Sequence, residues 1–291
     1  MLSIVISAHN EEHVISRSLD ALLSQETPVP IEVIVSANGC TDRTVERATR
    51  PGVVVIDRQE PGKAAALNAG DRAASGFPRI YLDADIIVPR GGLAAVLARF
   101  AETSHAQAVV PRRRLDTAGR PWSVRAYLSI HERLPAFRTG LFGRGMIALS
   151  AEGRARFDAF PDMIADDLFL DALFTTAEKV EESSVVVVVA APFATVDLVR
   201  RLVRVRRGNA QMRAGAMGGR IGVRVRPADR WSWLRDVVLP NPRLLPAAVP
   251  YVVITVIAGL LARRTAKPGA GWGRDESTRR TRPSATNGAS A

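Results

Sequence analysis

The sequence predicts an α/β fold built on a doubly wound, mostly parallel sheet with flanking helices, and two observations carry this prediction. Short β-branched runs alternate with amphipathic segments through the first ninety residues, in the order strand, helix, strand, helix, strand. A polar turn follows each of the main runs, and open α/β sheets bind ligands at the carboxyl ends of their strands. The 291 residues, 47% of them hydrophobic, suffice for one large domain and an appendage.

The first half of the chain supplies most of the predicted sheet. Leu2–Ala8 is an apolar strand, and Asn10 is expected to cap the following helix, with Glu11 and Glu12 in its first turn. Further strands are predicted at 31–35, 53–56 and 80–82, and helices from about residue 44 and over 64–74. This order is typical of a parallel sheet.

Two carboxylates, Asp83 and Asp85, follow the run that begins at Ile80. A buried strand should not carry unpaired acids, so we expect the strand to end there. Residues two apart on an extended chain point the same way. The two acids could therefore share one cation, or one could hold the cation and the other a ligand hydroxyl. From the spacing alone, a polar strand end that faces solvent is an equal alternative.

Beyond residue 90 the pattern is less regular. Helices are predicted at 93–100, 122–134, 168–174 and 195–207, strands at 108–111 and 185–191, a charged loop at 112–120, and a glycine-rich loop at 140–145 before an apolar run at 146–149. The helix at 195–207 is rich in arginine, and Arg206 falls among its apolar residues. We therefore expect either a buried acid or ligand beside Arg206 or a helix that ends before it.

The basic charge is concentrated at the C-terminus. The net charge is +11, and residues 199–291 hold nineteen Lys or Arg against four Asp or Glu. Such a segment could meet nucleic acid, an acidic partner or an anionic membrane surface. Aromatic residues are only 5% of the chain and none interleaves with the arginine helix, which argues against nucleic acid. The single cysteine, Cys40, excludes an internal disulfide and fits a reducing compartment, and no signal peptide is expected.

A nineteen-residue stretch without charge, 244–262, lies between Arg243 and Arg263. Its length could just span a bilayer, but Pro246 and Pro250 make an interfacial segment an open alternative. We therefore predict a main domain at 1–208, with halves at 1–90 and 91–208. A basic connector at 209–243, a transmembrane or interfacial segment at 244–262 and a disordered basic tail at 263–291 follow.

Five motifs in order resemble a known family. They are SIVISAHNEE (3–12), VIVSANGCTDRT (33–44), GKAAALNAG (62–70), the DxD-like sequence Asp83-Ala84-Asp85, and the pair Asp166-Asp167. The chain is similar in these motifs to the family 2 glycosyltransferases of GT-A fold, from residue 2 to about residue 208. The order of the motifs is far more specific than any one of them.

The resemblance implies an inverting glycosyltransferase that uses a UDP- or GDP-sugar and a divalent cation, Mn²⁺ or Mg²⁺. It places the metal on Asp85 and Asp83 and the general base on Asp167, with Asp166 beside it. It assigns donor binding to six residues and acceptor or diphosphate binding to three. The donor set is Ala8, Asn10, Glu11, Asn38, Lys63 and Asp83; the acceptor set is Gly145, Arg201 and Arg204.

The chemistry of these residue types suits such a reaction. A cation held by carboxylates would stabilise the diphosphate leaving group. A helix that begins at Lys63 would favour an anion, and an acceptor hydroxyl needs a base. Taken alone, the pair Asp166-Asp167 reads as an ordinary acidic helix start.

The sequence departs from the family pattern at two places. Ala37 and Asn38 replace paired aspartates, which puts the base of the nucleotide in doubt. Arg204 matches an arginine of the processive members, whereas Val205 replaces their tryptophan, so we predict a single addition. The acceptor is expected to be a lipid-linked or cell-envelope glycan at the cytoplasmic face of the membrane. A catalytically silent membrane-bound scaffold and a nucleotidyltransferase are the alternatives.

Overall fold

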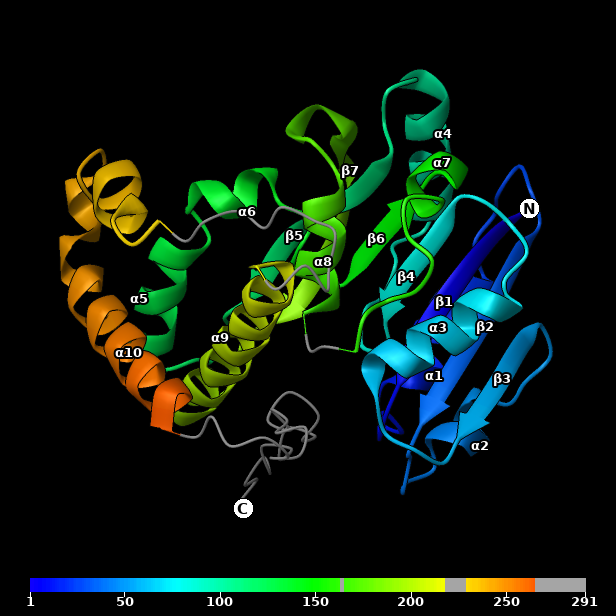
Figure 1. Ribbon diagram of the computed structural model, residues 1–291, viewed down its shortest axis with the longest axis horizontal. Coiled ribbons are helices and arrows are strands. Elements are labelled where there is room, and N and C mark those ends of the chain that lie inside the picture. The colour runs from blue at the N-terminus through cyan, green and yellow to red at the C-terminus, as the bar shows by residue number, and fades with distance from the viewer. Residues whose placement is uncertain (163–164, 218–228, 265–291) are drawn as a thin grey trace, which may run out of the picture.

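A mixed seven-stranded sheet runs through the centre of the computed structural model, which describes residues 1–162, 165–217 and 229–264 (Figure 1). The strand order is β3-β2-β1-β4-β6-β5-β7. The strands are β1 (Leu2–Ala8), β2 (Ile31–Asn38), β3 (Val53–Arg58), β4 (Arg79–Asp83), β5 (Ala108–Asp116), β6 (Met146–Leu149) and β7 (Lys179–Ala190). β1 to β4 are parallel, β6 is antiparallel to β4 and β5, and β7 is parallel to β5. The predicted doubly wound sheet is confirmed.

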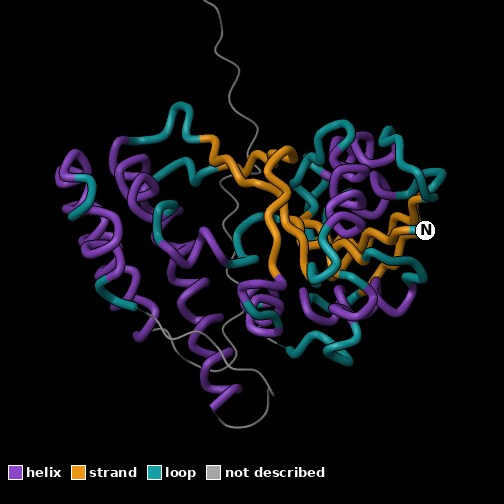
Figure 2. Tube along the Cα trace, turned by 90° about the horizontal axis from the view of Figure 1, so that it is seen from above, coloured by secondary structure: helices purple, strands orange, loops and turns teal. Residues whose placement is uncertain are grey.

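Alternating side chains along the strands divide the sheet core between two faces. Ile4 and Ile6 belong to the cluster covered by α1 and α4, whereas Val5 packs with α3 and α8 on the other face. Figure 2 shows helices on both sides of these strands. The helices around the sheet are α1 (Ile15–Leu23), α2 (Thr44–Ala48), α3 (Lys63–Ala73), α4 (Gly92–Glu102), α7 (Ala151–Arg154) and α8 (Asp166–Leu173).

A second, helical body lies beside β5 and β7. It consists of α5 (Trp122–His131), α6 (Pro135–Thr139), α9 (Thr195–Met217), a π-helical turn at Trp233–Val238 and α10 (Leu245–Arg264). Its apolar cluster joins α5, α9 and α10 through residues such as Leu198, Tyr127 and Ile254. The long arginine-rich helix thus packs against the apolar C-terminal helix and also contacts α5 and α8 (Figure 1).

Two predictions about local structure are wrong. The helix expected to start at Asn10 begins at Ile15, because Asn10 adopts a left-handed φ of 53° and bonds to a neighbouring turn instead. The expected charged loop at 112–120 is largely strand: β5 continues to Asp116 beside β7, after a register shift between Pro111 and Arg112. β7 is correspondingly longer than the strand predicted at 185–191.

One of the two alternatives for Arg206, a helix that ends before it, is wrong, and the other, an acid or ligand beside it, stays a prediction. α9 continues well past this residue to Met217, and the Arg206 Nη1 lies 3.4 Å from where a Cβ on Gly259 would be. The guanidinium therefore points into the contact between α9 and α10, where the glycine leaves room for it. The predicted domain limit at residue 208 falls inside α9. The tail beyond residue 264 and the connector residues 218–228 lie outside the described residues.

Candidate active site

The candidate site lies where three parallel strands end side by side. The register pairs Ser7 with both Ser36 and Asp83, so the carboxyl ends of β1, β2 and β4 meet at one edge of the sheet. Ala8, Asn38 and Asp83 are the last residues of these strands. Side chains that follow them are brought together by the parallel order itself.

Lys63 is the centre of a charged cluster at this edge. Its Nζ lies 3.0 Å from Asp83 Oδ1 and 3.0 Å from Asp166 Oδ2. Lys63 is the first residue of α3, Asp83 ends β4, and Asp166 begins α8. Burial alone would lower the pKa of Lys63, but Asp166, Asp83 and Asp167 outweigh it and raise the pKa. The ammonium therefore stays charged and ties three elements together.

The pKa of the Asp167 carboxyl is raised above its ordinary value. Its pKa is raised to about 6 by burial first and by the Asp166 carboxylate second. Lys63 and the Gly143 N–H, which donates to Asp167 Oδ2 at 3.1 Å, oppose that rise. A carboxylate of this kind is a stronger base than an exposed aspartate and is still ionised at neutral pH.

The turn after β1 is bonded to the turn after β2. Asn10 Oδ1 accepts from the Thr41 N–H at 2.8 Å, and the Glu11 N–H donates to Thr44 Oγ1 at 2.6 Å. Thr44 thus provides a hydrogen-bond partner for the Glu11 N–H, which would have been in the first turn of the expected helix. They also hold the residues expected to bind the donor at the same edge as Asp83.

Asn38 is fully buried behind these turns. Its amide donates to the Ala8 carbonyl at 2.7 Å and its Oδ1 accepts from the Gly62 N–H at 3.0 Å. The side chain thus joins the ends of β1 and β2 to the residue before Lys63. Both polar groups of the Asn38 amide are thus hydrogen-bonded within the protein. A direct contact between Asn38 and the donor stays a prediction.

Asp83 and Asp85 do not lie on one extended strand with their side chains pointing the same way, as the spacing suggested. The strand stops at Asp83, and the Ile86 N–H donates to its carbonyl at 3.1 Å, so Asp85 lies in a turn and is exposed. A Cβ on Gly145 would lie 2.5 Å from Ile86 Cγ1 and 3.5 Å from Asp83 Oδ2, so the glycine lets this loop approach Ile86 and Asp83 closely. Carboxylate oxygens such as those of Asp83 and Asp85 are the ligand type that a hard cation such as Mn²⁺ or Mg²⁺ prefers.

No group of three or more His, Cys, Asp or Glu side chains in the described ranges is arranged to hold a metal by itself. A cation at Asp83 and Asp85 would therefore take its other ligands from water or a substrate. Such partial coordination is usual for cations that bind together with phosphates.

The structure brings Gly145 to this cluster and places Arg201 beside Arg113, whereas a contact of Arg201 with acceptor or diphosphate stays a prediction. The Asp83 N–H donates to the Gly145 carbonyl at 2.8 Å. Arg201, on α9, lies near Arg113 and His131: its charge contributes, after burial, to the lowered pKa of both groups. Arg204 lies about one turn further along α9.

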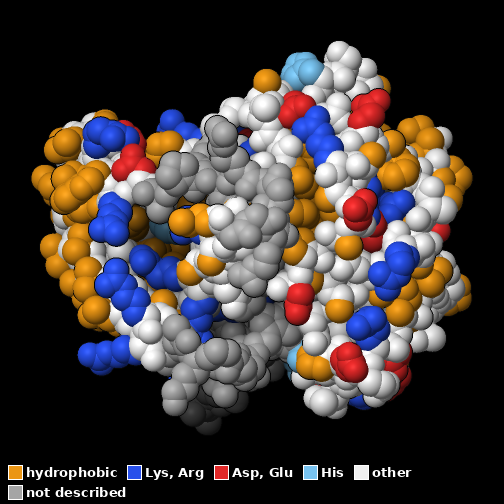
Figure 3. Space-filling view, viewed as in Figure 1, with side chains coloured by type: hydrophobic (Ala, Val, Ile, Leu, Met, Phe, Trp, Pro, Cys, Tyr) orange, Lys and Arg blue, Asp and Glu red, His pale blue; other side chains and the backbone are white. Residues whose placement is uncertain are grey.

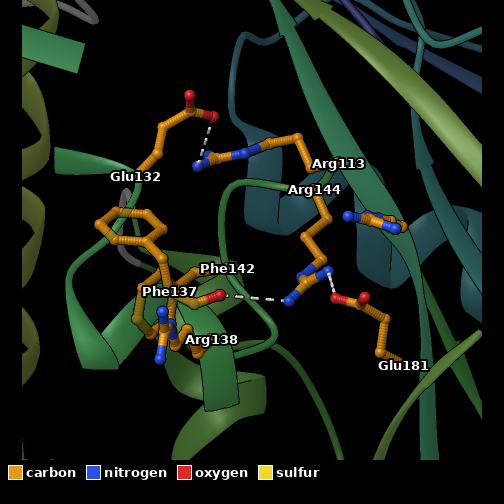
Figure 4. Close-up of a pocket in the computed structure, with 8 residues that line it drawn as sticks. Arg113, Glu132, Phe137, Arg138, Phe142, Arg144 and Glu181 are labelled. Atoms are coloured by element: carbon orange, nitrogen blue, oxygen red, sulfur yellow. Dashed lines mark hydrogen bonds and ion pairs between the residues drawn. The ribbon is translucent and has the colours of Figure 1, made fainter. Parts of the chain in front are cut away.

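A basic cavity of about 430 Å³ adjoins the glycine loop, and sequence reasoning missed it (Figure 4). Arg113 donates to the Gly143 carbonyl at 3.0 Å, so this glycine contacts both the cavity and Asp167. The run Arg112–Arg114 is the sequence feature that could have indicated this basic cavity. Its three consecutive charges give no alternation of apolar and polar residues, so it was predicted to lie in a loop and not in β5.

Comparison with known proteins defines the class to which this fold and site belong. The sequence model described as Glycosyl transferase family 2 matches residues 3–150, about half of the chain. The chain therefore belongs to glycosyl transferase family 2.

Two curated relatives match a shorter part. Glucosyl-3-phosphoglycerate synthase of Mycobacterium tuberculosis is 33% identical over 96 residues, 30% of this chain and 30% of that protein. An uncharacterised glycosyltransferase of Nostoc sp. is 32% identical over 90 residues, 29% of this chain and 28% of that protein. The matched region is less than a third of the length of these relatives.

A solved structure covers more of the chain. The mannosyltransferase PcManGT from Pyrobaculum calidifontis, in complex with GDP-Man and Mn²⁺, aligns with a TM-score of 0.59 at 24% identity. The alignment covers 91% of this chain and 79% of that one. This likeness shows that the predicted GT-A fold is correct.

One helical segment in the described part of the chain is long and apolar enough to cross a membrane. It comprises Pro242–Arg264, and 28% of its apolar window is buried within the protein. One face of α10 packs on α5 and α9 through Tyr251, Ile254 and Ala258. Apolar side chains gather along the outer edge of the molecule where α10 lies, with basic side chains nearby (Figure 3).

Proposed function

We propose that this chain transfers a sugar from a nucleotide-sugar donor to an acceptor hydroxyl by a single inverting displacement. The observation that supports it most is the convergence of Lys63, Asp83, Asp166 and Asp167 at the carboxyl edge of a family 2 sheet. Ionised and proton-accepting groups lie there together, where an α/β sheet binds its ligand.

The proposed roles follow from the electrostatics of each group. Asp167 accepts the proton of the acceptor hydroxyl, because its raised pKa makes it a good general base. Asp166 shares Lys63 with Asp83 and so positions the base relative to the donor. Asp83 and Asp85 would hold Mn²⁺ or Mg²⁺. A bound cation would neutralise charge on the diphosphate as it leaves.

The donor is a UDP- or GDP-sugar in this proposal. Asn10 and Glu11 border its nucleotide, and Lys63 offers its ammonium to the phosphates. Ala8 and Asn38 support the donor site indirectly, because Asn38 hydrogen-bonds the Ala8 carbonyl and the N–H of Gly62, the residue before Lys63. Gly145 holds the glycine loop against the end of β4, because its carbonyl accepts from the Asp83 N–H at 2.8 Å.

The acceptor is proposed to be a lipid-linked or cell-envelope glycan at the cytoplasmic face of the membrane. The support is the apolar outer face of α10, with Arg263 and Arg264 at its end, which suits an anionic membrane surface. A single addition is supported by Val205, which is exposed on α9 where processive members carry tryptophan.

The chemistry is tested by binding and by turnover. Titration of the full chain with UDP, GDP and their sugars should show nucleotide binding that tightens with Mn²⁺. Asp85→Asn should weaken the effect of Mn²⁺, whereas Asp167→Asn should retain binding and lose turnover by about 10²- to 10⁴-fold. Full turnover in both variants would contradict the roles assigned here. Binding without transfer or donor hydrolysis in the unmodified chain would favour a silent scaffold.

A further inference from the structure

The cavity beside the glycine loop opens to solvent and is lined by side chains from several elements. β5 supplies Arg112 and Arg113, α6 supplies Phe137 and Arg138, and Arg144 enters from the glycine loop (Figure 4). Its volume of about 430 Å³ is of the size that small-ligand sites have.

Two of its arginines are fixed by the protein. Arg144 is buried, pairs with Glu181 and donates to the carbonyls of Pro111 and Phe137 at 2.8 and 3.1 Å. Arg113 lies 3.6 Å from Glu132 and stacks on the Phe137 ring at 5.0 Å. These two guanidiniums have their charges balanced by carboxylates of the same cavity.

The other two arginines leave the cavity with an excess of positive charge. Arg112 and Arg138 are exposed, and within the described residues no carboxylate lies in ion-pair distance of either. Arg201 adds a further cation near Arg113, and burial together with Arg201 and Arg144 lowers the pKa of Arg113. Like charges gathered in a concave site repel one another unless an anion binds among them.

The cavity is linked directly to the proposed base. The Gly143 N–H donates to Asp167 Oδ2 at 3.1 Å, and its carbonyl accepts from Arg113 Nη1 at 3.0 Å. One residue therefore contacts both groups. A molecule that contacts Arg113 in the cavity is thus connected to the proposed base through the two hydrogen bonds of Gly143.

We propose that this cavity binds an anionic group, a phosphate or a carboxylate, of the acceptor whose hydroxyl is glycosylated. The anion lies between Arg112 and Arg138, which supply the uncompensated charge, and Arg113 forms the inner wall. The inference rests on the proposed function, because it names the acceptor class for the same site. It makes the acceptor an acidic molecule and gives the arginine-rich strand a role in recognition.

The test uses inorganic phosphate as probe on the full chain, by calorimetric titration at constant ionic strength. The unmodified chain should bind phosphate saturably. The double variant Arg112→Gln with Arg138→Gln should bind it about tenfold or more weakly, because it lacks both charge-assisted contacts. Arg114→Gln is the matched control: this residue is exposed on the same strand but does not line the cavity, and its binding should equal that of the unmodified chain.

A second pair of measurements separates this site from the donor site. Lys63→Met should leave phosphate binding in the cavity intact. The double variant should still bind nucleotide with Mn²⁺. If the unmodified chain binds no nucleotide, that result contradicts the proposed function but does not contradict the cavity proposal. Absent phosphate binding, equal binding by the double variant, or binding lost only in Lys63→Met would each overturn the proposal.

The source of the anion is resolved with two ligands. Glycerol 3-phosphate in solution represents a soluble acceptor, and vesicles of phosphatidylcholine with phosphatidic acid represent a lipid headgroup. A tenfold loss in the double variant with the first ligand assigns a soluble anion, and a loss only with the vesicles assigns a headgroup. If neither ligand distinguishes the double variant from Arg114→Gln, the cavity does not recognise the acceptor.

Discussion

At the scale of single residues, Asp167 makes a prediction about pH. Its pKa rises from 3.8 to about 6 on folding, so the folded chain holds this proton more tightly than the unfolded chain does. The stability that results is present below pH 3.8 and is lost as pH rises through about 6. Asp167→Asn removes this dependence. Without donor or metal, urea unfolding should show the variant gaining stability relative to the unmodified chain across that pH range; parallel curves would contradict the raised pKa.

Lys63 should oppose that rise in the pKa of Asp167. Its ammonium lowers the pKa against the effects of burial and Asp166. Lys63→Met should therefore move the pH midpoint of Asp167 upward, as followed by carboxyl infrared absorption or by NMR. Lys63→Arg keeps a positive charge and should move the midpoint much less. An unchanged midpoint in Lys63→Met would show that the lysine does not reach the base.

At the scale of elements, the loop before β6 depends on glycine at position 145. Its φ is +70°, and a Cβ would lie 2.5 Å from Ile86 Cγ1. Gly145→Ala should cost about 1–2 kcal/mol for the left-handed backbone and about 1–3 kcal/mol for crowding. Gly91→Ala is the control, since Gly91 has a φ of +76° and no atom within 4 Å of the added Cβ. Chemical denaturation should show the larger loss at residue 145; equal losses would mean that Ile86 moves away freely.

A buried ion cluster joins α3, β4 and α7. Asp71 accepts from Arg79 Nη1 at 2.6 Å and from the Tyr81 hydroxyl at 2.8 Å, and pairs also with Arg154. Asp71→Asn leaves the buried guanidinium of Arg79 and the partly buried one of Arg154 uncompensated, which should cost about 3–5 kcal/mol in the free energy of unfolding. Asp20→Asn removes an exposed pair with Arg50 and should cost at most about 1 kcal/mol. Similar losses in both variants would show that the cluster is not a structural centre.

Sequence reasoning predicted most elements because their hydrophobic periods are clear. The apolar runs of β1, β2 and β4 needed no tertiary information, and the family resemblance assigned Lys63 and Asp83 to one donor site, although it did not predict their ion pair. The helix start predicted at Asn10 was wrong because the Asn10 side chain can either cap a helix or bond to another turn. The turn at Thr41, which supplies its hydrogen-bond partner, is brought close only by the fold. The arginine cavity depends on β5, α6 and the glycine loop meeting, which no local pattern specifies.

At the scale of the whole molecule, α10 presents two different faces. Tyr251 and Ile254 are buried against α5 and α9, whereas Val249, Val256 and Leu260 are 68%, 52% and 50% exposed. The packed face holds the helix along the protein, so the membrane contact proposed above would use the outer face of α10 and not a span across the bilayer. Replacing these three exposed residues by serine should reduce sedimentation with anionic vesicles at least tenfold while the fold persists.

The control for this prediction is a replacement far from α10. Val54, on β3, is 51% exposed, so Val54→Ser removes a similar apolar side chain and should not change sedimentation. Higher salt should also weaken the association, since Arg263 and Arg264 contribute through charge. Equal sedimentation of the triple variant and the unmodified chain would exclude α10 as the membrane contact.

The bridge from Lys63 to Asp83 and Asp166 has a consequence for the order of events in the cleft. In the free protein the ammonium already stands where positive charge is needed, so the carboxylates do not repel one another while no ligand is bound. If the proposed metal and donor bind here, a divalent ion alone would have to compete with Lys63 for Asp83. A diphosphate bound with that ion would offer Lys63 a new partner, so the proposed site would favour binding of metal and donor together.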